Sequence, residues 1–215
     1  MKMRKMMFIA VALVCAMSVQ ADIIANLLVN SGFESDPYDT GWTGILGGGG
    51  RVEGGAEGGA VNSGAQAVIF DFQDMGPWAF FGLQQNVAVT AGETYELDGF
   101  VNILNTAPII GKLEWTWRDS GGGDLGSGGT PDYTGDAGTW TYQDMVMSEL
   151  VAPTGAVSID VKVVAGSIGT TVGWNAVTFD DISFGQQAIP EPATIGMLGL
   201  GCVGVFLMRR RMVQI

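Results

Sequence analysis

The sequence contains no histidine. This absence excludes the Ser-His-Asp and Cys-His catalytic arrangements, zinc sites that use histidine, and proton transfer through an imidazole. It has only two cysteines, Cys15 and Cys202, and both lie in apolar segments near the chain ends. Residues 22–191 between those segments contain no cysteine, so no disulfide can stabilise them.

Basic residues are scarce in the same part of the chain. Residues 22–191 hold all 22 acidic residues and only four basic ones, Arg51, Lys112, Arg118 and Lys162, which gives a formal charge of −18. This charge disfavours nucleic acids and anionic membrane surfaces as partners. Cations and neutral polymers are the compatible ligands.

A sustained apolar repeat of 3.6 residues is also missing from residues 22–185, which argues against a helical domain. Apolar and polar residues instead alternate in short segments that Gly, Pro and Asp separate, most clearly at Thr94–Leu104. The pattern predicts an all-β domain, an antiparallel β-sandwich or barrel. The predicted strands are 25–30, 66–72, 83–90, 94–104, 111–118, 140–150, 156–165 and 171–184, with a long loop at 119–138.

The N-terminus has the three features of a secretory signal peptide. Lys2–Lys5 is basic, residues 6–17 are apolar, and Val19-Gln20-Ala21 has the small residues of a cleavage site. We therefore expect residues 1–21 to direct the chain to the secretion translocon. The mature protein would begin at Asp22.

The C-terminus combines two prolines, an apolar run and a basic end. Residues 194–208 carry no charge, and Arg209, Arg210 and Arg211 follow them. As a helix, these 15 residues span about 22 Å against a hydrocarbon core of about 30 Å. We predict a short transmembrane helix within 193–211, with the arginines on the cytoplasmic side. The alternative is a buried helix of a soluble protein.

The residues before this run form the motif Ile189-Pro190-Glu191-Pro192-Ala193. Pro190 and Pro192 cannot continue a helix or a sheet ladder, so they would hold Glu191 extended, where a protease could grip it. In this order, motif, helix and arginines resemble the PEP-CTERM sorting signal of Gram-negative bacteria. The resemblance implies that exosortase, a membrane enzyme, processes the chain near the Pro-Glu-Pro motif. Residues 186–192 would be the linker between the domain and its membrane anchor. The resemblance also implies a final place at the cell surface or outside the cell.

A second resemblance covers most of residues 26–185. Several segments resemble strands of jelly-roll carbohydrate-binding modules and galactose-binding-like domains. The resemblance implies a jelly-roll β-sandwich over residues 22–185, and less directly sugar binding, because a fold does not fix a function. The segments are 26–34, 41–42, 85–95, 138–140, 151–153 and 177–184.

Three acidic residues are candidates for a structural calcium site. In the resembling modules, positions matching Glu34, Asp180 and Asp181 often supply Ca²⁺ ligands, and Ca²⁺ prefers oxygen ligands. Alternation along the last strand would place Asp180 on the inward side with Ile182 and Phe184, where a carboxylate needs compensation. The alternative is that these carboxylates are solvated or accept hydrogen bonds from backbone N–H groups.

Aromatic residues are candidates for stacking against sugar rings. Trp115 and Trp117 share a face at strand spacing, and Trp78 lies in a predicted loop. Aromatic residues at period two more often fill the core of a sandwich, which makes Trp78 the best candidate. No pair of carboxylates is singled out by its spacing as the machinery of a glycoside hydrolase.

These patterns together predict an exported, non-enzymatic protein of the cell surface or extracellular matrix, sorted through its C-terminal signal. A carbohydrate-binding module for exopolysaccharide is the first alternative, and a secreted glycoside hydrolase is the second.

Overall fold

The computed structural model describes residues 23–37, 39–46, 52–54, 61–104, 108–134 and 143–187. These residues belong to one compact unit, Ile23–Gln187. The predicted signal peptide, the sorting motif and the C-terminal apolar run lie outside the described residues. Within the described ranges, no helix is long and apolar enough to cross a membrane.

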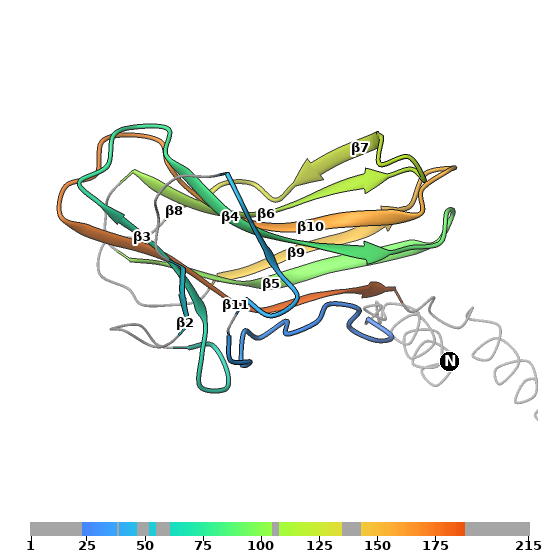
Figure 1. The fold of residues 1–215 in the computed structure, drawn as a ribbon, viewed down its shortest axis with the longest axis horizontal. Helices are drawn as coiled ribbons and strands as arrows, with labels where there is room; N and C mark the ends of the chain where they lie inside the picture. Colours follow the sequence, from blue (N-terminus) through green and yellow to red (C-terminus); the bar gives the residue numbers. More distant parts are fainter. Residues whose placement is uncertain are drawn as a thin grey trace, which may run out of the picture. The chain divides into compact units, whose positions relative to one another are not determined.

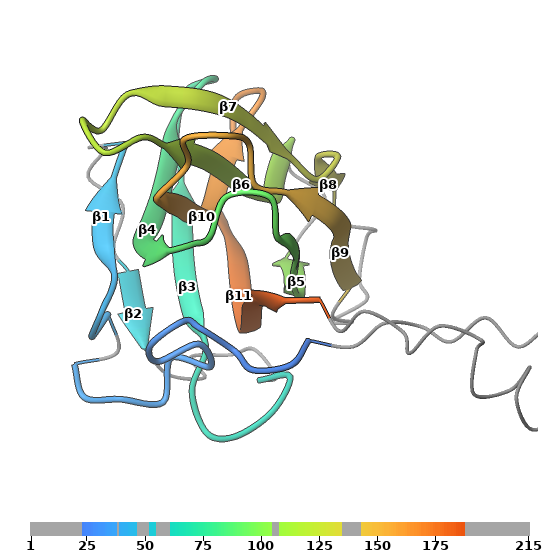
Figure 2. The ribbon, with the colours of Figure 1, turned by 90° about the vertical axis from the view of Figure 1, so that its right-hand side faces the viewer.

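The described part of the chain is all-β and folds into two antiparallel sheets (Figures 1 and 2). We call the sheet with strand order β1-β4-β10-β6-β7, in which β8 also pairs with β6, the first sheet. The second sheet has the order β2-β3-β11-β5-β9. The strands are β1 Thr43–Ile45, β2 Val52–Gly54, β3 Val68–Gln73, β4 Phe80–Ala88, β5 Thr94–Leu104, β6 Ile109–Arg118, β7 Asp124–Gly129, β8 Tyr133–Thr134, β9 Gln143–Val151, β10 Ser158–Ser167 and β11 Trp174–Gln186.

The core lies between the two sheets and follows the alternation along the strands. Leu83, Val163 and Leu113 stand in register across β4, β10 and β6, and each is almost fully buried. Phe179 of the second sheet is also fully buried and meets Phe70 edge-on. Burial of such apolar side chains, at about 25 cal/mol per Å² of apolar surface, is the main term that holds the sheets together.

Most predicted strands are present, and β5 has the predicted bounds. The segment 25–30 is different, because it is not a strand in the structure. The Asn26 side chain donates to the Ile182 carbonyl oxygen and accepts from the N–H groups of Leu28 and Phe184. These bonds replace a regular ladder beside β11, so the segment follows the sheet edge without joining it as a strand.

Two strands lie inside the predicted loop 119–138. They are β7 and β8, and every residue of β7 is exposed. A strand at the edge of a sheet, with no side chain in the core, needs no apolar alternation, so the sequence Asp124-Leu-Gly-Ser-Gly-Gly129 gives no strand signal. Its pairing with β6 alone makes it a strand.

Candidate functional site

The candidate site is the outer face of the first sheet, which is the side turned away from the core. Because side chains alternate along a strand, the neighbours of buried Leu83, Val163 and Leu113 point to this side. Gln84, Lys162 and Glu114 form one row across the sheet; Asn86, Asp160 and Thr116 form the next row. We call these six residues and Arg118 the polar strip.

The polar strip is tied together by charged hydrogen bonds. Arg118 Nε donates to Asp160 Oδ2 at 2.7 Å, and Asn86 Nδ2 donates to Asp160 Oδ1 at 2.8 Å. Lys162 Nζ donates to Thr116 Oγ1 at 2.8 Å. These bonds orient planar and charged groups before any ligand arrives, which lowers the entropy that a bound ligand would have to overcome.

Glu114 has a different partner, because it pairs with Lys112 at 2.6 Å between Nζ and Oε1. Lys112 also lies on the outer face, opposite Val164. The side chains of Lys112, Glu114 and Arg118 are each about a quarter to a third exposed. Along β6, Glu114 and Arg118 of the polar strip are therefore accessible to solvent, whereas Thr116 and its neighbour Asp160 are buried.

Beyond the polar strip, the same face becomes apolar. Phe80, Ile110 and Gly166 stand in one row. A Cβ atom on Gly166 would collide with the Phe80 ring, so the ring lies over this glycine. Two residues earlier, Trp78 is 71% exposed in the loop before β4. We call Trp78, Phe80, Ile110 and Val164 the apolar end.

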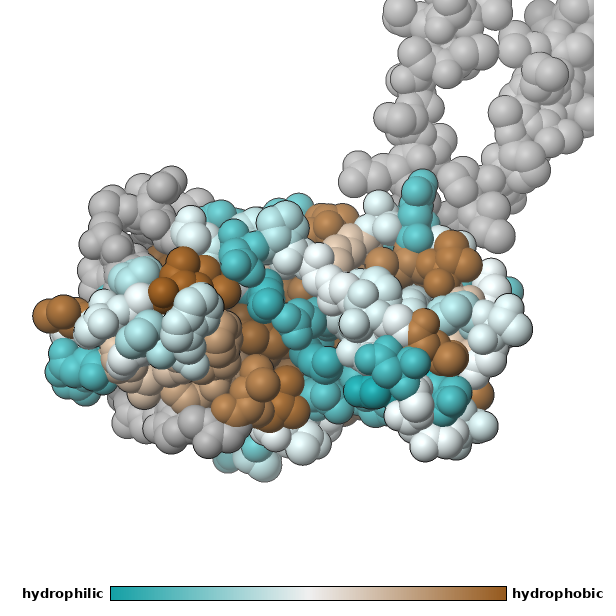
Figure 3. All heavy atoms as spheres, turned by 90° about the horizontal axis from the view of Figure 1, so that it is seen from above, coloured by the Kyte–Doolittle hydropathy of each residue, from teal (hydrophilic) through white to brown (hydrophobic). Residues whose placement is uncertain are grey.

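Trp78 is held in position by its backbone. Its φ is 69°, in the left-handed region, and its N–H donates to the Ser167 carbonyl oxygen at 2.7 Å. Left-handed φ is unfavourable for a bulky residue and occurs where the surrounding structure enforces it, often at functional sites. The structure thus presents an indole ring at the apolar end. Viewed from the side of β4, β6, β7 and β10, hydrophilic residues gather in a band beside hydrophobic ones (Figure 3).

The other two tryptophan candidates lie on the opposite side of β6. Trp117 is 3% exposed and packs against Tyr95 in the core, at 6.1 Å between ring centroids. Trp115 is half-buried and packs against the same core. Its ring also lies against Gly128 of β7, since a Cβ atom on that glycine would be only 2.8 Å from the ring. Trp117 offers no ring face to a ligand, and both residues fill space between the sheets, as period-two aromatics commonly do.

The sequence contained a signal for the polar strip. Lys112, Glu114, Thr116 and Arg118 alternate with the apolar residues of β6, and Ser158, Asp160 and Lys162 do so in β10. However, alternation does not say which strands are neighbours. Gln84 and Asn86 of β4 join the site only through the register of β4 with β10.

Glu34, Asp180 and Asp181 are brought together at a corner of the second sheet. Gly32 lies beside all three, since a Cβ there would be within 4 Å of each side chain. The loop after residue 61 binds the carboxylates. Asn62 and Ser63 donate to Asp180 and Asp181, and the N–H groups of Ala65 and Gln66 donate to Glu34 Oε1 at 2.8 and 3.0 Å.

Simple alternation along the strand predicts that Asp180 shares a side with Ile182 and Phe184. The structure shows that it does not. The register of β11 with β5 shifts between Asp180 and Ser183, and Asp181 adopts a φ of 50°. Asp180 instead alternates with buried Phe179, on the other side of the sheet, and is still 0% exposed under the Asn62 loop. Burial raises the pKa of Asp180 from 3.8 to about 6, although three backbone N–H groups oppose the change.

Glu34, Asp180 and Asp181 supply the kind of ligand atoms that a calcium site uses, but their side chains are not grouped around one point where an ion could bind. Their donor atoms are all oxygens, as Ca²⁺ prefers. Among the residues that the structure describes, no three His, Cys, Asp or Glu side chains are grouped so as to hold a metal ion. The three carboxylates accept backbone and side-chain hydrogen bonds from the Asn62–Gln66 loop instead. Calcium at this corner stays a prediction, and binding would require the loop to release carboxylate oxygens.

The calcium prediction can be tested by melting residues 22–187 with calcium and with EDTA. At about 100 times its dissociation constant, calcium would stabilise the fold by about 2.7 kcal/mol, or about 5–10 °C for a domain of this size. Glu34→Gln should remove the stabilisation, and magnesium serves as the control cation. Equal midpoints in calcium and EDTA would rule the site out.

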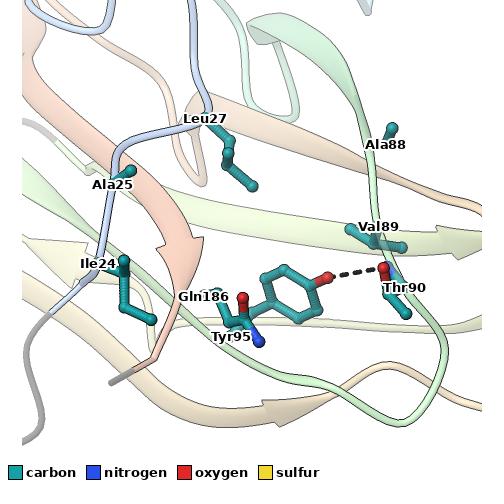
Figure 4. A pocket seen from close by; sticks show the side chains of 8 residues that line it. All are labelled: Ile24, Ala25, Leu27, Ala88, Val89, Thr90, Tyr95 and Gln186. Atoms are coloured by element: carbon teal, nitrogen blue, oxygen red, sulfur yellow. Dashed lines mark hydrogen bonds between the residues drawn. The ribbon is translucent and has the colours of Figure 1, made fainter. Parts of the chain in front are cut away.

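A pocket of about 290 Å³ lies near the end of β4 (Figure 4). Its walls are mostly apolar, and the Tyr95 hydroxyl that faces it already accepts a hydrogen bond from the Thr90 N–H at 2.8 Å. Few polar groups converge there, so it lacks the specificity elements of a ligand site. The lining residues are Ile24, Ala25, Leu27, Ala88, Val89, Thr90, Tyr95 and Gln186.

Residues 188–211 match the PEP-CTERM protein-sorting motif. The match contains Pro190, Glu191, Pro192, Arg209, Arg210 and Arg211, all outside the described residues. No curated protein matches the chain by sequence.

Solved structures with a similar fold include carbohydrate-binding modules. The C-terminal family 22 carbohydrate-binding module of Clostridium thermocellum Xyn10B has a TM-score of 0.54 and 13% identity, over 79% of this chain and 96% of that one. A xylan-binding domain of family 22 has a TM-score of 0.52 and 14% identity, over 78% and 99%. These similarities assign a jelly-roll fold to the described domain.

The enzymatically active domain of tailspike protein 4 from bacteriophage CBA120 is also similar, with a TM-score of 0.56 and 17% identity. That match covers 75% of this chain but 21% of the tailspike chain. At such identities, the comparisons support the fold and leave the function to the residues of the site.

Proposed function

We propose that this protein is exported and sorted through its C-terminal motif by an exosortase-type enzyme, and that its jelly-roll domain binds extracellular polysaccharide. In this proposal, residues 1–21 are a signal peptide, and residues 193–211 hold the chain in the membrane of a Gram-negative cell until processing. The domain then acts at the cell surface or in the extracellular matrix.

The observation that carries the binding proposal is the outer face of the first sheet. It has an exposed indole and a half-buried phenyl ring at one end and rows of fixed polar groups further along the same strands. Sugars have apolar C–H faces and polar hydroxyl edges, so they suit a surface that offers aromatic rings next to hydrogen-bonding side chains. A non-enzymatic role agrees with the carboxylates of this face, since Asp160 and Glu114 are each paired with a basic residue.

Replacing Trp78 should test the binding proposal most directly. We expect Trp78→Ala to weaken retention on a bound polysaccharide by about tenfold or more, because an exposed stacking ring contributes to affinity and not to the core. The measurement is affinity electrophoresis or titration against a panel of polysaccharides.

Trp174→Ala is the matched control, because Trp174 is also exposed (40%) but belongs to the second sheet. It should leave binding unchanged. Equal losses in both variants, or no loss in Trp78→Ala, would contradict the proposed site. Turnover of a polysaccharide that disappears on changing one carboxylate would support a hydrolase instead.

A further inference from the structure

The fold gathers the few positive charges of the exported domain on one face. Lys112, Arg118 and Lys162 all lie on the outer face of the first sheet, on the neighbouring strands β6 and β10. They are three of the four basic residues in residues 22–191, and the fourth, Arg51, lies outside the described residues. A chain that is acidic in sum therefore has the basic side chains of its described residues on one face, beside the carboxylates of Glu114 and Asp160.

The ion pairs on this face leave one of the three basic side chains, Lys162, without a carboxylate partner among the described residues. Arg118 is paired with Asp160, and Lys112 with Glu114. Lys162 has only the Thr116 hydroxyl at 2.8 Å, and no carboxylate of the described residues lies within 4.0 Å of its Nζ. An ammonium group has three donors, so two remain available to a ligand.

The acidic residues elsewhere weaken this local charge only partly. At physiological salt, charges further than about 8 Å apart are largely screened, whereas neighbouring strands are about 4.8 Å apart. A bound group on the polar strip therefore senses the unpaired ammonium group of Lys162 and the two ion pairs beside it more strongly than the carboxylates elsewhere in the domain. The half-buried position of Lys162 reduces the screening further.

We infer that the outer face of the first sheet selects an acidic polysaccharide, one whose sugars carry carboxylate groups, and that Lys162 binds the carboxylate. This inference rests on the proposed polysaccharide function and narrows its ligand class. Gln84, which stands in register with Lys162, and Asn86, in the next row, supply hydrogen bonds to hydroxyl groups. Phe80 lies four residues before Gln84 on β4, about 13 Å along the strand, so it and Trp78 accept sugars further along the polymer.

The test compares two polymers that differ only in charge. Polygalacturonate and its methyl-esterified form share one backbone, and the full-length protein is titrated with each in EDTA, which prevents calcium gels. We expect at least about tenfold tighter binding to the charged polymer, with the difference falling strongly between 0.05 and about 0.5 M salt as screening increases.

Substitutions on the face assign the effect to Lys162. Lys162→Gln should remove the preference for the charged polymer, and Lys162→Arg should keep it. Asp144→Asn is the control variant, because Asp144 is exposed on β9 of the second sheet, and it should also keep the preference.

Each contrary outcome has a separate meaning. Equal binding to both polymers would overturn the acidic ligand and leave the proposed polysaccharide function standing. No binding to either polymer or to the wider panel would overturn both. A preference for the charged polymer that survives in Lys162→Gln would overturn the assignment of Lys162.

Discussion

The stability of the exported domain should fall by about 2 kcal/mol as the pH rises from about 4 to about 6, in the absence of calcium. The cause is Asp180, whose pKa is raised by burial from 3.8 to about 6 in the folded protein. A raised pKa means that the folded state binds the proton more tightly than the unfolded state does. A difference of one in pKa between the folded and unfolded states corresponds to about 1.36 kcal/mol of stability.

The sign of this effect is opposite to that of an ion-paired carboxylate. Below about pH 3, Asp180 is protonated in both states, and its full stabilising contribution is present. That contribution is lost as the pH rises towards 6, where the folded domain must hold a buried carboxylate that no basic side chain among the described residues pairs with. Denaturant unfolding of residues 22–187 at several pH values in EDTA would measure the loss.

Asp180→Asn isolates this contribution from the general repulsion among acidic groups. It should flatten the pH profile by the amount that Asp180 contributes. Asp124→Asn is the control, because Asp124 is exposed and its carboxylate also accepts a backbone N–H, from Gly126 at 2.7 Å. If Asp180→Asn keeps the slope of the native protein, the buried carboxyl is not its source.

Changing the sorting motif should abolish release of the mature protein almost completely. Pro190→Ala removes a residue that keeps the backbone extended. Glu191→Ala removes the charge that we expect the processing enzyme to recognise. We expect the uncut chain to accumulate in the membrane fraction. Mass spectrometry of the C-terminus in the native host would identify both the cut and the uncut forms.

Ala188→Ser is the matched control for these variants, because it lies in the same sorting match but outside the Pro-Glu-Pro residues. It should be processed normally. Normal surface display or release of Glu191→Ala would contradict processing at the motif. Replacing Arg209–Arg211 by Gln tests the basic end separately, and should impair retention of the anchor before processing.

The sequence was sufficient for the β class and for the faces of the central strands. In β6 and β10, apolar residues alternate with Lys, Glu, Thr, Arg and Asp, and a half-buried strand requires this period of two. The match to the sorting motif at residues 188–211 is likewise local, since a short linear signal needs no fold around it. Trp78 could be selected because an aromatic residue in a loop has little role in packing.

Other features were beyond sequence reasoning, because they depend on contacts between distant residues. The edge strand β7 is defined by pairing with β6 and not by its side chains. Asp180 is turned by a shift in the register of β11, and then buried by a loop about 118 residues earlier in the chain. Local alternation cannot report either event.

The order of the amino acids was enough to predict an exported, acidic, antiparallel β domain without disulfides and with a sorting signal at its end. Contacts between strands were needed to show that Trp115 and Trp117 fill the interior, and that Gln84, Lys162 and Glu114 share one row on the outer face. The same contacts bring three of the four basic residues together on that face. Strand order accounts for this division, because alternation within a strand sets which side a residue faces, while pairing between distant strands sets its neighbours.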